Sequence, residues 1–146
     1  MLLEFSETGV VLLSQEWDWL DIIRMLVSAF LAAIYLQSGI DKIVDRQGNL
    51  DFMGEHFSGT ILAGSFHYGL AIVTATELLA GALSAAGVAW LLLGWGIVPG
   101  IVGTLFAAVS SCILMAGQRL AKDYIGATAL VPYFLVAIIG LYLYQL

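Results

Sequence analysis

Charge is the scarcest property of this sequence. Only 11% of its 146 residues are charged, whereas 61% are hydrophobic, and the mean hydropathy is +0.97. A soluble domain carries roughly 25% charged residues, so this chain has too little polar surface to cover a water-exposed globule. The composition excludes an ordinary soluble enzyme and a disordered segment. It indicates a single-domain integral membrane protein whose main partner is the lipid bilayer.

Basic residues and cysteine are also nearly absent. Lys and Arg number 5 against 11 acidic residues, which excludes a surface that tracks nucleic-acid phosphates. The one cysteine, Cys112, cannot form an internal disulfide, and we interpret it as a small buried hydrophobic residue. No basic residue precedes Arg24, so the acidic segment 1–20 lacks the start of a secretory signal and is expected to be retained.

Motifs that hold metals or cofactors are missing. Glycine-rich nucleotide loops, a GxSxG elbow and an HExxH helix do not occur. His56 lies outside the apolar stretches and His67 at the edge of one, which disfavours a two-histidine haem or zinc site. We therefore expect no metal site and no recognisable cofactor motif, with quinone left open as a ligand. Any enzymatic role would be that of a subunit.

Four apolar stretches are long enough to cross a membrane, which takes about 20 residues. We place them at about 22–40, 68–89, 97–116 and 125–146. No segment shows the alternation of a β-strand. The sequence thus predicts an all-α membrane protein, with four transmembrane helices in an up-down-up-down bundle. Leu50–Thr60 is predicted to be a short interfacial segment, and Pro132 is expected to kink the last span.

The distribution of basic residues predicts the orientation. Loop 41–67 carries Lys42 and Arg46, loop 117–124 carries Arg119 and Lys122, and the opposite side has only Arg24. Lys and Arg concentrate in short cytoplasmic loops, so we expect these two loops in the cytoplasm and both termini outside. This is the topology of a multi-pass protein in a bacterial-type inner membrane.

Small residues recur at helical spacing in the second and third spans. Examples are Gly81 with Ala85, and Gly100 with Gly103. Small side chains let helix backbones approach closely in a membrane. We favour contacts inside one bundle, with a homo-oligomer contact as the alternative.

Glu77 is the most informative residue. It lies about nine positions into its span, roughly 13 Å deep, near the middle of a hydrocarbon core about 30 Å thick. Ionisable residues at such depth are costly and are functional by default. Proton relay, ligand binding and quinone hydrogen bonding all fit, and the alternative is an ion pair between helices. Thr74 lies one turn earlier, and Arg24 either reaches the interface or faces inward.

Two polar groups flank the spans. In the first, three side chains share a helix face at i,i+4 spacing beside a lysine, and in the second an arginine and an aspartate are spaced i,i+4. The candidates are Gln37, Asp41, Lys42, Asp45, Arg119 and Asp123. Both groups are expected on one membrane side, where they would form a charged entrance to Glu77. Solvated helix ends are the alternative.

The order of these motifs resembles the DoxX family of small four-helix membrane proteins. The resemblance rests on SGIDKIVDRQGNL after the first span, TELLAGAL around Glu77, and GQRLAKDYIGAT before the fourth span. The positions that match the family's polar pattern are Arg24, Lys42, Glu77, Arg119 and Asp123. Members are similar to a subunit of thiosulfate:quinone oxidoreductase or look like accessory partners of redox systems.

Three functions follow as expectations. The first, which the resemblance implies, is a membrane subunit or accessory component of a respiratory or redox complex, in which Glu77 contacts quinone. The second is a structural or assembly subunit without a site of its own. The third is a small proton-coupled transporter that uses Glu77. Expected partners are other membrane subunits or further copies of the chain.

Overall fold

Four helical segments are long and apolar enough to cross a membrane. The computed structural model describes residues 3–12 and 15–146. The segments are α1 (Trp19–Val44), α3 (Phe66–Leu92), α4 (Val98–Leu120) and a fourth formed by α5 (Tyr124–Ala129) with α6 (Val131–Leu143). A helix pairs its backbone N–H and C=O groups within its own segment, and lipid offers these groups no hydrogen-bond partners. The predicted all-α, multi-pass membrane fold is therefore confirmed.

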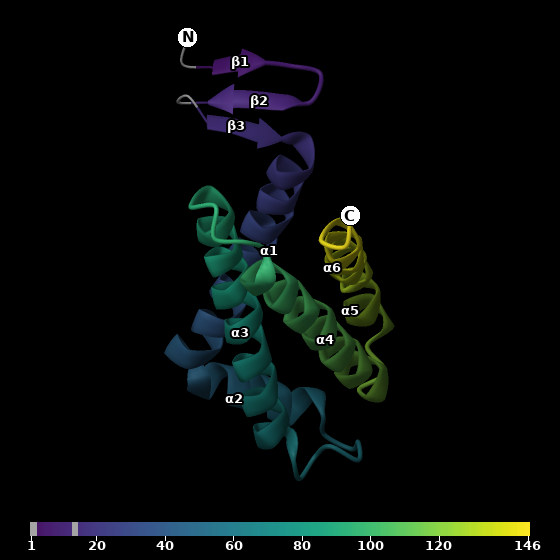
Figure 1. The fold of residues 1–146 in the computed structure, drawn as a ribbon. Helices are drawn as coiled ribbons and strands as arrows, with labels where there is room; N and C mark the ends of the chain where they lie inside the picture. Colours follow the sequence, from purple (N-terminus) through teal and green to yellow (C-terminus); the bar gives the residue numbers. More distant parts are fainter. Residues whose placement is uncertain (1–2, 13–14) are drawn as a thin grey trace.

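The helices run up and down in chain order. Figure 1 shows α3 beside α1 and α4, and the two described chain ends at the same end of the bundle. Helix α6 contacts α4 and, less extensively, α1. The short helix α2 (Arg46–His56) lies at the opposite end, against the start of α3. It begins four residues before the predicted interfacial segment because Asp45 caps it by accepting a hydrogen bond from the backbone of Gly48.

A three-stranded antiparallel sheet precedes the bundle. Its strands are β1 (Leu3–Phe5), β2 (Gly9–Leu12) and β3 (Gln15–Asp18), in that spatial order. The expectation of no strand was wrong. Strands of three or four residues offer too few alternating positions for the period of two to be recognised. The alternation of the side chains between the two faces becomes visible only once the strands are paired, as where Val10 lies opposite Trp17.

Pro132 divides the fourth span. Proline has no N–H, so the carbonyl four residues earlier, that of Thr128, loses its helical partner. The span accordingly ends as α5 at Ala129 and resumes as α6 at Val131, with Pro132 in the first turn. The expected irregularity is thus present, as a break between two helices.

Small residues bring α3 close to both neighbours. A Cβ added at Gly87 would lie 2.5 Å from the Cα of Gly100, and one at Gly103 would lie 2.4 Å from the backbone nitrogen of Ser84. On the other side of α3, Gly81 faces Leu36 of α1 in the same way. The predicted close contacts inside one bundle are therefore confirmed for Gly81, Gly100 and Gly103.

The outer face of the helices is apolar. On α4, Leu105 and Val109 are exposed along one stripe, and Cys112 follows on it one turn later. Such a surface suits contact with lipid tails. The interpretation of Cys112 as buried was wrong, because its side chain lies on the exposed stripe of Leu105 and Val109, whereas the preceding Ser110 and Ser111 are the buried residues.

Candidate functional site

Glu77 is buried between α1 and α3, where only 1% of its surface is exposed. Its Oε1 accepts a hydrogen bond of 2.9 Å from the hydroxyl of Ser38 on α1. Ser38 lies six residues before the end of α1, which is about 9 Å along the helix axis. The first turn of α3 lies beside α2, where Phe66 and Gly69 face it. Glu77 therefore lies nearer to the α2 end of the bundle than its place near the middle of the apolar run suggests.

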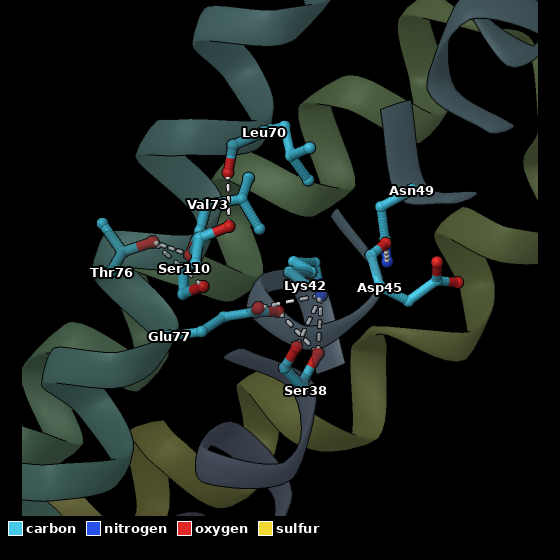
Figure 2. Close-up of polar contacts among 10 residues, drawn as sticks. Ser38, Lys42, Asp45, Asn49, Leu70, Val73, Thr76, Glu77 and Ser110 are labelled. Atoms are coloured by element: carbon cyan, nitrogen blue, oxygen red, sulfur yellow. Dashed lines mark hydrogen bonds and ion pairs between the residues drawn. The ribbon is translucent and has the colours of Figure 1, made fainter. Parts of the chain in front are cut away.

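Lys42 supplies the counter-charge (Figure 2). Its Nζ lies 2.8 Å from Oε2 of Glu77 and donates hydrogen bonds to the Ser38 hydroxyl at 2.7 Å and carbonyl at 3.3 Å. The Lys42 side chain is 16% exposed, against 2% for that of Glu77. The ammonium group thus reaches inward from the end of α1 nearest α2. The attraction between the two charges offsets part of the cost of removing them from water.

One carboxylate oxygen remains under-used. Oε2 of Glu77 is buried, and its one polar contact among the described residues is with the ammonium group of Lys42 at 2.8 Å. A carboxylate oxygen has two lone pairs that accept hydrogen bonds, and leaving them unused in a low-dielectric interior is costly. The atom is therefore available to a hydroxyl group that enters the bundle.

Hydroxyl groups surround this pair. The hydroxyl of Tyr35 donates to the carbonyl of Ala107 at 2.9 Å and lies 2.6 Å from the hydroxyl of Ser111. Next to Glu77 on α3, the hydroxyl of Thr76 lies 3.3 Å from that of Ser110. We call the following set the polar layer: Tyr35, Ser38, Lys42, Thr76, Glu77, Ser110 and Ser111. Its side-chain contacts link α1 to α4, α1 to α3 and α3 to α4.

Four residues predicted near Glu77 make no contact with it. Gln37, Asp41 and Asp45 share a helix face, as expected, but all three are exposed. Asp45 caps α2 instead of joining the site. Thr74 donates back to the carbonyl of Leu70 within α3. Among the candidates of the first polar group, only Lys42 contacts Glu77.

The second polar group is separate from the polar layer. Arg119 is exposed and lies over the ring of Tyr124, with 4.8 Å between its Cζ and the ring centroid. Asp123 caps α5 by accepting a hydrogen bond from the backbone of Gly126 at 2.8 Å. Both residues stabilise the turn between α4 and α5. The predicted charged entrance therefore contains Lys42 but gains no contact from Arg119 or Asp123 to Glu77.

Arg24 lies at the opposite end of α1 and does not reach Glu77. It pairs with Asp21 at 2.9 Å and donates to the carbonyl of Leu143 at 3.0 Å, which satisfies a free carbonyl at the end of α6. Nearby, the hydroxyls of Ser28 and Tyr144 lie 2.6 Å apart. This contact fastens the chain end to α1.

The two histidines lie apart from the polar layer. Nε2 of His56 lies 2.7 Å from Oε1 of Gln118, which ties α2 to the end of α4, and His67 is exposed. Among residues 3–12 and 15–146, no group of three or more His, Cys, Asp or Glu could hold a metal ion. The contact of His56 is therefore a link between helices.

Sequence reasoning did not select the hydroxyl groups of the polar layer. On α1, Tyr35, Ser38 and Lys42 are spaced i, i+3 and i+7, so the signal was present as one helical face. Ser110 and Ser111 do not indicate a polar site by themselves, because serine in an apolar span equally allows close helix contact. No family model, curated protein or solved structure matches the chain.

Proposed function

We propose that this chain is a DoxX-like membrane subunit of a respiratory or redox complex, and that its Lys42–Glu77 pair binds the headgroup of a quinone. The proposal rests on the buried Oε2 of Glu77, whose one polar contact among the described residues is with Lys42, so that it can accept a further hydrogen bond. It also draws on the resemblance of the motifs around Lys42 and Glu77 to the DoxX pattern. The complex would lie in a bacterial-type inner membrane, with loops 41–67 and 117–124 in the cytoplasm.

The chemistry of a quinone suits these groups. A quinone carbonyl accepts hydrogen bonds, and a quinol hydroxyl donates them. The hydrogen bond from Lys42 to the carbonyl of Ser38 is the longest of the lysine's contacts, at 3.3 Å. A ligand carbonyl can take the place of the Ser38 carbonyl at little cost in free energy. Glu77 can accept the quinol hydroxyl through Oε2 and take its proton. Electrons would pass to or from a partner subunit.

Quinone titration tests the proposal. The chain, reconstituted in lipid nanodiscs, is titrated with decylubiquinone and with a short-chain menaquinone, and binding is followed by calorimetry. We expect Glu77→Gln and Lys42→Met each to weaken binding about tenfold or more, since each removes a charge-assisted hydrogen bond. Asp41→Asn and Lys122→Met are matched controls at exposed positions. Absence of binding, or equal loss in the controls, refutes the proposal.

A second candidate is a structural subunit without a site of its own. It is favoured by the ion pair itself, because Lys42 and Glu77 join α1 to α3 without any ligand. In that case Glu77→Gln would change the mass of the complex on native gels and leave quinone affinity unchanged.

Cation exchange is less well supported. In a proton-coupled exporter, an intramembrane carboxylate exchanges a proton for a cationic substrate. Here the tethered ammonium of Lys42 lies 2.8 Å from that carboxylate and competes with any external cation. Efflux of a lipophilic cation from proteoliposomes, dependent on Glu77, would favour transport over the quinone proposal.

A further inference from the structure

An apolar layer separates Glu77 from the end of the bundle at which the two described chain ends lie (Figure 1). One helical turn nearer that end, α1, α3 and α4 each place a fully buried apolar residue, and these are Leu31, Ala80 and Ala107. All three belong to one packed core cluster, to which α6 adds Ala137. Moving an ion through an apolar interior is costly, so this layer opposes the passage of a proton between Glu77 and the water at that end.

A second set of buried hydroxyl groups lies beyond the apolar layer. Ser28, Ser84 and Thr104 each lie seven residues from a member of the polar layer on the same helix, which is about 10 Å along the helix axis. A hydrogen bond joins atoms about 3 Å apart, so these hydroxyls do not reach the polar layer. Ser28 pairs with Tyr144 and Thr104 donates to the carbonyl of Gly100, so both hydroxyls serve local contacts.

Toward α2, Lys42 stands between Glu77 and water. Its Nζ lies 2.8 Å from Oε2 of Glu77, and 16% of its side chain is exposed. Asp41 and Asp45 beside it are exposed, which places this end of α1 at the surface of the bundle. An ammonium group that contacts a buried carboxylate and belongs to a partly exposed side chain can carry a proton between that carboxylate and water.

Other titratable groups near the pair are engaged elsewhere. The hydroxyl of Tyr35 donates to the carbonyl of Ala107, so its proton is already in use. Asp45 caps α2, and His56 links α2 to α4. Cys112 lies on the outer stripe of α4. Among the described residues, Lys42 is therefore the titratable side chain in contact with Glu77.

We propose that Glu77 exchanges its proton only with the side of the membrane at which α2 lies, and that Lys42 carries the proton. The inference rests on the proposed function for the source of that proton, the hydroxyl of a bound quinol. Once Glu77 has taken the proton, Lys42 has no counter-charge in a nearly buried position, and burial disfavours the charged form. Lys42 then releases one proton to water and accepts the proton of Glu77, which restores the ion pair. For each proton that leaves the quinol, one proton appears on the α2 side.

Infrared spectroscopy of proteoliposomes that hold the chain in one orientation tests the route without quinone. The pH is lowered on one side at a time, and the carboxylic-acid band that Glu77→Gln abolishes reports the protonation of Glu77. Cleavage near the exposed Ile61, in the turn after α2, by an external protease shows which side faces outward. We expect acid on the α2 side to protonate Glu77 about tenfold faster, or more, than acid on the other side.

Lys42→Arg distinguishes a proton carrier from a fixed counter-charge. Arginine keeps the positive charge but does not release its proton in proteins. Protonation of Glu77 from the α2 side should therefore slow about tenfold or more in this variant. Lys122→Arg makes the same change at an exposed position and should leave the rate unchanged.

Four results would overturn the inference. They are equal rates from the two sides, no protonation of Glu77 from either side while the chain stays folded, an unchanged rate in Lys42→Arg, and equal slowing in Lys122→Arg. The comparison of the two sides uses the parent chain, so it decides the matter even where Lys42→Arg does not fold. Sided exchange without quinone binding would refute the quinone proposal and retain the proton route. Quinone binding with equal exchange from both sides would do the reverse.

Discussion

Removal of Lys42 should destabilise the bundle more than removal of Glu77. In Lys42→Met, the carboxylate of Glu77, only 1% exposed, keeps the Ser38 hydrogen bond but loses its counter-charge. Breaking a buried ion pair by removing one partner costs about 3–5 kcal/mol. In Glu77→Gln, the lysine that remains is 16% exposed and can move its ammonium group toward the headgroups beyond α1. We therefore expect a cost of about 1–2 kcal/mol for that variant.

The double variant measures the interaction between Lys42 and Glu77 separately from the contribution of each residue. Lys42→Met/Glu77→Gln leaves no unpaired charge, so its cost should fall below the sum of the single costs by about 1–3 kcal/mol. The free energy of unfolding is measured for all four proteins in mixed micelles of dodecylmaltoside and sodium dodecyl sulfate. Asp41→Asn, which changes an exposed carboxylate next to Lys42, should stay within about 0.5 kcal/mol of the parent.

Two results would refute this reasoning. If the single costs add to the double cost, the two charges do not interact as the 2.8 Å contact requires. If Glu77→Gln costs as much as Lys42→Met, Lys42 cannot leave the interior. Either result would show that Lys42 is held among the helices by groups other than Glu77.

Three further changes test the bundle. Gly103→Leu should cost more than 3 kcal/mol of unfolding free energy, because even a Cβ would lie 2.4 Å from the backbone of Ser84; Gly64→Leu, where nothing lies within 4 Å, is the matched control in the same detergent assay. Tyr35→Phe removes two buried hydrogen-bond contacts and should cost about 1 kcal/mol by the same measurement, since single interhelical bonds in membranes average about 0.6. Arg24→Gln should speed hydrogen exchange at residues 141–145 while exchange in α3 stays constant, because the Leu143 carbonyl loses its partner.

The sequence was sufficient for features that depend on local composition. The low fraction of charged residues and the length of the four apolar runs predicted the spans, because a membrane helix must satisfy its backbone within one segment. The same scarcity of charge selected Glu77 as the ionisable residue of the second span. Polar residues at the helix ends identified Lys42, Asp45 and Asp123 as candidates, although the two aspartates serve as helix caps.

Only the tertiary structure decided which cation meets Glu77. The sequence left the direction of Arg24 open and placed Lys42 either in a charged entrance to Glu77 or at a solvated helix end. The position of a residue along its own helix does not fix its height beside another helix. Helix α3 is apolar on nearly all sides, so its sequence does not indicate which face Glu77 shares with α1. That choice is made where Gly81 faces Leu36 and Gly103 faces Ser84, since these close approaches fix the rotation and height of α3 between its neighbours.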